Sequence, residues 1–190
     1  MSKTQVARRL RHTARLVGDT IQFDRADRPL ELPLDFWSDL ALVQDDSGLV
    51  EMAGLAGPLG QGFSDPLSDW RALAADCRAI LRASLGGAEH LPAGFADSLG
   101  EFGDLGAVAT RLVQAGHVVL VPAGHAGFYV GGAGKRGGTL ALALDTAARF
   151  PVYSLCNQCG RVIANEKKPR TYCGAACRKA AHVQSKGESA

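Results

Sequence analysis

Hydrophobic residues in the first 150 positions recur mostly at intervals of three and four. This spacing is longest from Trp70 to Leu85, where it predicts an amphipathic helix that starts near Asp65-Pro66 or Ser68 and stops at Gly86-Gly87. The same spacing predicts shorter helices over residues 34–43, over 47–56 with Ser47 as cap, over 105–114, and over 140–149 with Thr139 as cap. The hydrophobic pattern therefore predicts a mostly helical region.

Strand patterns are fewer and shorter. The run Val17 to Phe23 predicts a strand followed by a turn, although Leu10, Ala14 and Val17 also fit a helix over the N-terminal arm. Residues 118–121 form the strongest strand pattern, and residues 128–130 predict a further strand. Residues 86–106 contain six glycines and Pro92, which predicts a loop.

The glycine-rich stretch Gly131 to Lys135 suggests a phosphate-binding loop, but its spacing excludes one. Tyr129 stands where the first glycine is required, and Arg136 stands where a Ser or Thr would bind magnesium. The interpretation favoured instead is a hairpin within residues 124–138 whose tip is glycine-rich and basic.

The composition of the 190 residues is that of a folded chain with little net charge. Hydrophobic residues make up 46%, the net charge is +2, and no apolar run approaches the roughly 20 residues of a spanning helix. Residues 1–15 hold five Lys or Arg and no acid, which we interpret as a solvated basic arm rather than a transit peptide. We expect a cytoplasmic protein.

Four of the five cysteines occur near the C-terminus in two close pairs, Cys156/Cys159 and Cys173/Cys177. Such pairs are typical of a site where four thiolates surround one Zn²⁺. Gly160 would let the chain turn with a positive φ, a hairpin is expected between the pairs over residues 161–172, and a helix is expected from Ala175. Disulfides are disfavoured because no secretory signal precedes the cysteines and Cys77 would be left over in a helix.

These elements predict an α+β fold. Residues 1–150 would form a mostly helical domain with a β-hairpin, and residues 151–190 a small treble-clef-like zinc finger. Four thiolates leave no open position on the metal, so we expect a structural Zn²⁺ rather than a hydrolytic one.

The segments Leu155 to Arg161 and Arg170 to Ala181 resemble the bacterial CGNR-type zinc finger of stress-induced transcription regulators. The resemblance implies that the four cysteines are metal ligands and that the protein binds DNA; Arg161, Tyr172 and Arg178 stand at positions where the family has Arg, an aromatic and a basic residue. Cys177-Arg178-Lys179-Ala180 replaces the family's Cys-Gly-Asn-Arg, and the basic helix after it is shortened. A small zinc protein that inhibits DNA gyrase has a similar cysteine arrangement.

Two functions follow as hypotheses. In the first, the finger binds nucleic acid as a transcription regulator, with phosphate contacts from Arg161, Lys167, Lys168, Arg170, Arg178 and Lys179. In the second, the finger is a structural staple or an inhibitor module that docks a protein, which the shortened basic helix favours. An enzyme is not expected, because the five histidines are scattered and no catalytic spacing is present. The expected partner is DNA or a protein, and not a membrane.

Overall fold

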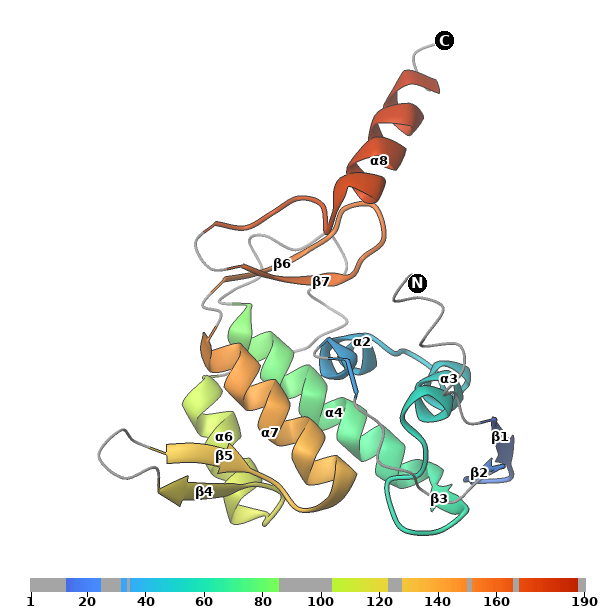
Figure 1. Cartoon of the computed structure of the whole chain (residues 1–190), viewed down its shortest axis with the longest axis vertical. Coiled ribbons are helices and arrows are strands. Elements are labelled where there is room, and N and C mark those ends of the chain that lie inside the picture. The colour runs from blue at the N-terminus through green and yellow to red at the C-terminus, as the bar shows by residue number, and fades with distance from the viewer. Residues whose placement is uncertain are drawn as a thin grey trace.

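Two long helices lie side by side at the centre of the molecule (Figure 1). They are α4 (Leu67–Ser84) and α7 (Gly134–Arg149), and each buries one apolar stripe against the other. This computed structural model describes residues 13–24, 32–33, 35–85, 104–122, 128–149, 152–165 and 168–187. Within those ranges it contains six helices and seven strands in small antiparallel sheets, so the predicted α+β class is confirmed.

Three shorter helices pack around this pair. Helix α2 (Phe36–Ala41) crosses α4 and α7, α3 (Asp46–Ala56) lies beside the N-terminal strands, and α6 (Leu105–Gln114) packs on α4. Asp45, rather than the predicted Ser47, caps α3 by accepting a 2.8 Å hydrogen bond from the Gly48 amide. A carboxylate one residue before the helix can reach that amide, whereas Ser47 is already inside the first turn.

The N-terminal sheet has three strands, β1 (Ala14–Val17), β2 (Thr20–Phe23) and β3 (Ser64–Pro66). The strand predicted from Val17 to Phe23 is confirmed over Thr20 to Phe23 but does not continue through Gly18, and the alternative helix is wrong over Ala14 to Val17, which form β1. Gly18 adopts a φ of 58°, which turns the chain sharply and lets β1 pair with β2. Strand β3 comes from residues predicted to start α4.

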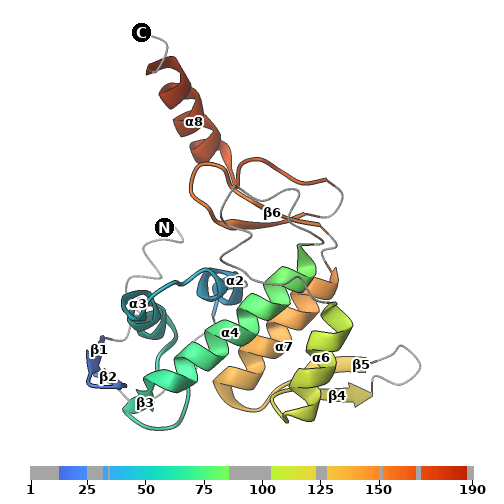
Figure 2. The same cartoon turned by 180° about the vertical axis from the view of Figure 1, so that it is seen from behind.

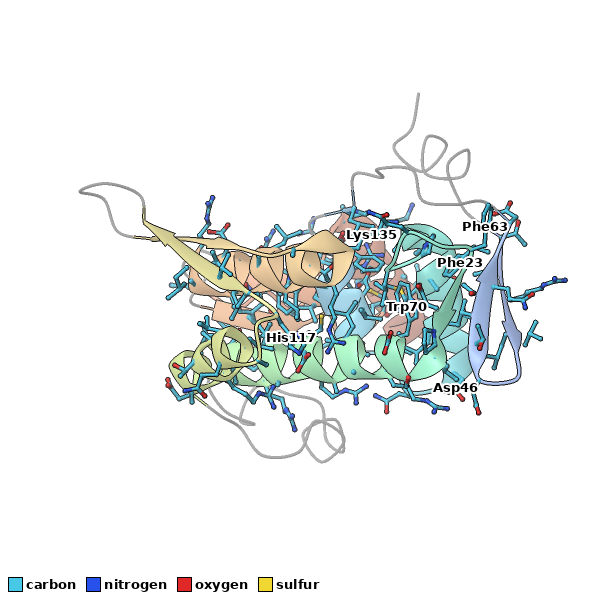
Figure 3. All side chains as sticks on the ribbon, turned by 90° about the horizontal axis from the view of Figure 1, so that it is seen from below. Phe23, Asp46, Phe63, Trp70, His117 and Lys135 are labelled. Carbon is cyan, nitrogen blue, oxygen red and sulfur yellow. The ribbon has the colours of Figure 1, made fainter. Side chains whose placement is uncertain are left out.

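The second hairpin joins β4 (Val119–Pro122) to β5 (Phe128–Gly131) and lies against α7. The two predicted strands are confirmed, but the hairpin predicted within residues 124–138 is wrong. Strand β5 pairs backward with β4, and the glycine-rich residues after it lead into α7, which begins at Gly134 rather than at Thr139. Lys135 donates a 2.7 Å hydrogen bond to the Ala56 carbonyl at the end of α3. Figure 3 labels Lys135, in the first turn of α7, and His117, which lies between α6 and β4.

Glycine is required here by close packing. A Cβ on Gly132 would lie 2.0 Å from the Gly137 carbonyl carbon, and one on Gly137 would lie 2.7 Å from the His117 oxygen. The stretch that suggested phosphate binding therefore contributes to a backbone crossing, in which Gly132 and Gly137 have no room for a Cβ.

The C-terminal elements are β6 (Val152–Leu155), β7 (Val162–Asn165) and α8 (Ala175–Gly187). The β6–β7 hairpin lies over α2 and the ends of α4 and α7, and α8 projects away from the body (Figures 1 and 2). Tyr153 meets Trp37 of α2 edge to face with ring centroids 6.2 Å apart, and its hydroxyl donates to the Thr146 carbonyl of α7. Tyr153, Leu155 and Val162 belong to the same buried cluster as the helices.

Some predictions fall outside the described residues: the basic arm over residues 1–12, the turn over residues 25–29, the loop over residues 86–103, and Lys167. Among the helices that the structure does describe, none is both long enough and apolar enough to cross a membrane.

Candidate metal centre

The first cysteine pair occupies the turn of the β6–β7 hairpin. The Cys156 amide donates to the Arg161 carbonyl at 2.9 Å, and the Gly160 amide donates to the Cys156 carbonyl at 2.8 Å. Gly160 has a φ of 68°, so the predicted positive-φ turn is confirmed. The hairpin predicted between the pairs over residues 161–172 is wrong, because β7 pairs backward with β6 and the cysteine turn itself joins the two strands.

The second pair lies at the start of α8. Cys173 precedes the helix and Cys177 lies in its first turn, where the Arg178 amide donates to the Gly174 carbonyl. The Asn157 amide donates to the Thr171 carbonyl at 3.0 Å and so holds the two pairs together. The helix predicted from Ala175 is confirmed, and the C-terminal module combines a cysteine turn, a hairpin and a helix, although the turn joins the two strands of the hairpin instead of preceding them.

The four sulfur atoms converge on one point. All lie within 4.8 Å of one another, with Cys159 and Cys173 Sγ 3.7 Å apart and Cys173 and Cys177 Sγ 3.4 Å apart. A tetrahedron with Zn–S bonds of about 2.3 Å has sulfurs about 3.8 Å apart. The four cysteines are thus positioned to hold a metal ion of that size.

Backbone amides surround one of these sulfurs. Burial raises the pKa of the Cys156 thiol, but hydrogen bonds from the amides of Cys173, Cys159 and Gln158 lower that pKa further, to about 6. Amide donors stabilise a thiolate and are the usual outer partners of a metal-bound sulfur. Cys156 therefore readily becomes a thiolate.

The Cys177 thiol retains its proton more strongly. Hydrogen bonding to Cys173 is the main cause that raises the pKa of Cys177, to about 12. A cation entering the cluster would have to displace such protons, so its binding should release protons to solvent.

The fifth cysteine has a different environment. Cys77 lies in α4 and is 0% exposed, among the residues of the helical core, and its sulfur is not part of the four-cysteine group. Burial is the main cause that raises the pKa of the Cys77 thiol, and the negative charge of Asp76 raises it further. The interpretation of Cys77 as a small buried hydrophobe is consistent with this position.

The basic residues predicted as phosphate contacts are divided between two faces. Arg161 points toward the helical region, with its Nε 3.9 Å from the Asp39 carboxylate of α2. Lys168, Arg170, Arg178 and Lys179 are all exposed on the finger. Arg161 therefore helps to join finger and helices, and the other four remain available at the surface.

A buried polar network, not anticipated from the sequence, orients one of these residues. Asn165 is 4% exposed and accepts a 2.9 Å hydrogen bond from Arg170 Nε, while its amide nitrogen donates to Ser154 Oγ. Ser154 in turn donates to the Arg170 carbonyl at 2.8 Å. An Asn and a Ser inside two short strands could have indicated buried hydrogen bonds. The register between β6 and β7 was needed to show that these two side chains bond to each other.

Two adjoining hollows cover the surface around α8. One, of about 360 Å³, lies over residues 169–175 and Arg178; the other, of about 720 Å³, is lined by Tyr172, Ala175, Arg178, Lys179, Ala181 and His182. Tyr172, Ala175 and Arg178 line both. Among the described residues that line the two hollows, none is acidic.

Comparisons of this chain with protein-family models, with curated proteins and with solved structures found no match. The resemblance to the CGNR-type finger therefore rests on the cysteine spacing and the residues around it.

Proposed function

We propose that the four-cysteine cluster binds one structural Zn²⁺. Zinc prefers four tetrahedral thiolates, and the sulfur separations and the amide donors at Cys156 suit that geometry. Native mass spectrometry tests the assignment: the expected mass is that of the chain plus one zinc. A mass equal to the chain with free thiols, or with two disulfides, would overturn it.

We propose further that the finger binds nucleic acid as part of a transcription regulator. The observation that carries this proposal is the charge of the finger: residues 151–190 hold seven Lys or Arg against two acids, Glu166 and Glu188, and Lys168, Arg170, Arg178 and Lys179 are exposed. A cluster of four thiolates around a dication has a charge of minus two, which these cations more than offset. Phosphate groups are the natural ligand of such a surface.

The dependence of binding on salt tests this function. Affinity of the zinc-loaded protein for DNA should fall with salt, with log K against log[salt] sloping by about −0.9 per phosphate neutralised on duplex DNA. Replacing Lys167 and Lys168 together by Gln should reduce the slope by up to about two units and weaken all sequences alike, because lysines contact the backbone rather than the base edges. Absence of binding to duplex and single strands at low salt would exclude the regulator function.

A second candidate is favoured by the packing of the finger on the helices. Tyr153, Leu155 and Val162 are buried in the common core, and Arg161 approaches Asp39. Zinc would then serve to staple the C-terminal segment, residues 151–190, onto the domain formed by residues 1–150, leaving a surface that docks a protein. A partner captured only when Cys156 and Cys173 are intact, by a protein that binds no nucleic acid, would support this alternative.

We do not propose an enzyme. A closed four-thiolate shell leaves no position for water or substrate, and the part of the chain that the structure describes shows no second group of metal-ligating residues.

A further inference from the structure

We infer that the finger carries a subsite for a single-stranded nucleotide segment, in which a base stacks on Tyr172 and the adjoining phosphate lies between Arg170 and Arg178. This inference rests on the proposed nucleic-acid function and specifies its substrate class. All three residues line the hollow of about 360 Å³, and Tyr172 and Arg178 also line the larger one.

Arg170 is prepared to bind an anion. Its Nε donates to buried Asn165, which orients the guanidinium plane, while its two terminal nitrogens form no hydrogen bond with any other described residue. A guanidinium held in this way presents a rigid pair of donors that matches two phosphate oxygens. Asn165 is therefore a positioning residue for Arg170.

Arg178 supplies a second charge from another element. It follows Cys177 in the first turn of α8, is exposed, and forms no ion pair with the residues that the structure describes. The described residues that line the two hollows include no acidic side chain, so none of them competes with a phosphate for these two guanidinium groups.

Tyr172 supplies an aromatic surface between the two arginines. Its backbone is held on both sides, since the Thr171 carbonyl accepts from Asn157 and Cys173 belongs to the sulfur cluster. The side chain is half-buried yet lines both hollows. An aromatic ring beside cations is the arrangement with which proteins bind single strands, because every base has a face that can stack.

The position of the ring favours single strands over duplex. In a duplex the base faces are covered by neighbouring base pairs, so a ring that lines a hollow can stack only on a base that is already unpaired. Duplex DNA could still contact Lys168, Arg170, Arg178 and Lys179 through its phosphates. Single strands would gain the stacking contact in addition.

The test measures fluorescence anisotropy of the full, zinc-loaded chain with a labelled thymine oligonucleotide, with a duplex of equal length, and with thymidine monophosphate as competitor. The unaltered protein should bind the single strand more tightly than the duplex. Tyr172→Leu should weaken single-strand binding by roughly 5- to 150-fold, the loss expected for one stacked base, with the salt slope unchanged. Tyr172→Phe keeps the ring and should bind normally.

Two further measurements test the roles of Arg170 and Tyr172 separately from the effects of net charge and of folding. Arg170→Lys keeps the charge but cannot both bond to Asn165 and offer a pair of donors to a phosphate, so single-strand affinity should fall while the salt slope stays the same. Ultraviolet cross-linking of the unaltered protein to a strand containing 5-iodouracil should label the tryptic peptide 171–178, in which Tyr172 is the one aromatic residue. Native mass and circular dichroism verify that each variant keeps its metal and fold.

The inference and the proposed function fail in different ways. Equal or tighter binding to duplex, full affinity of zinc-loaded Tyr172→Leu, or cross-linking elsewhere would overturn the single-strand subsite and leave a phosphate-binding finger. If thymidine monophosphate displaces the labelled strand at concentrations similar to those of the strand itself, the site binds a mononucleotide. That result would also overturn the single-strand subsite. No binding to any of the three would overturn both.

Discussion

The buried carboxylate of Asp65 accepts three hydrogen bonds in the helical region. It is 4% exposed and accepts hydrogen bonds from the Leu59 and Gly60 amides, at 2.6 and 3.2 Å, and from Trp70 Nε1 at 3.1 Å. These bonds connect the loop after α3 to the buried face of α4. Figure 3 shows Trp70 among the helices, with Phe23 and Phe63 toward the hairpin end.

Asp65→Ala should therefore strongly destabilise the protein. Each hydrogen bond to a charged group contributes about 1.5–3 kcal/mol, and removing the acceptor leaves buried donors unpaired, so we expect a loss of about 3 kcal/mol or more in the free energy of unfolding. Urea denaturation measures it. Asp65→Asn retains one acceptor oxygen and should lose less; equal stability of all three proteins would contradict this role.

Cys77 should behave as a core residue and not as a ligand. Cys77→Ser should leave the zinc content unchanged and lower the free energy of unfolding by about 1–3 kcal/mol, because it places a hydroxyl among apolar side chains. In the native protein Cys77 should resist thiol reagents, since burial shields it and raises its pKa. Loss of the metal from this variant would show that the ligand assignment is wrong.

At the scale of the elements, the first turn of α7 packs directly against the backbone of His117 and Gly132. Gly137 and Gly138 are neighbours in the same helical turn, yet only Gly137 faces other backbone: its added Cβ would meet the His117 oxygen at 2.7 Å, whereas one on Gly138 would meet nothing within 4 Å. Two adjacent glycines thus have opposite requirements, which makes them a matched pair.

Gly137→Ala should destabilise the protein by about 1–3 kcal/mol, because the β5–α7 corner must move apart to admit the methyl group. Gly138→Ala should instead stabilise it by about 0.5–1 kcal/mol, since alanine has the higher helix propensity and the position is open. Thermal unfolding of the two variants compares them directly. A stabilised Gly137→Ala protein would refute the close crossing.

At the scale of the whole molecule, the metal site and the helical core share buried surface. Trp37 contacts Tyr153, and Tyr153, Leu155 and Val162 lie in the core cluster, while α8 projects outward with few contacts (Figure 1). A helix of 13 residues is marginal in isolation. We therefore expect the order of α8 to depend on its anchorage at Cys173 and Cys177.

Removing the metal should lower stability and helicity together. When free zinc exceeds its dissociation constant about a hundredfold, binding contributes about 2.7 kcal/mol to the free energy of unfolding, which chelation or Cys156→Ser would remove. Circular dichroism should show partial loss of helix, and thermal unfolding a lower midpoint. Cys77→Ser should keep its response to the chelator. A wild-type protein that is indifferent to chelation would contradict a structural metal.

Local sequence patterns were sufficient to predict several features of this protein. Cysteine spacing and Gly160 identified the sulfur cluster and its turn, and periodicity located the apolar stripes of α4 and α6, because these features depend on residues a few positions apart. The fold class followed from the same signals. The helix boundaries did not: the capping group of α3 and the start of α7 depend on which nearby group reaches the free amides.

Tertiary structure alone decided which distant residues meet. The pairing of β6 with β7 across the cysteine turn, the approach of Arg161 to Asp39, and the orientation of Arg170 by Asn165 all join residues whose local sequence carries no sign of the partner. The glycine-rich stretch is the plainest case, because its composition suits a phosphate loop or a hairpin tip equally well. Only the contact between Gly132, Gly137 and the His117 carbonyl shows that these two glycines are required because backbone segments lie in direct contact there.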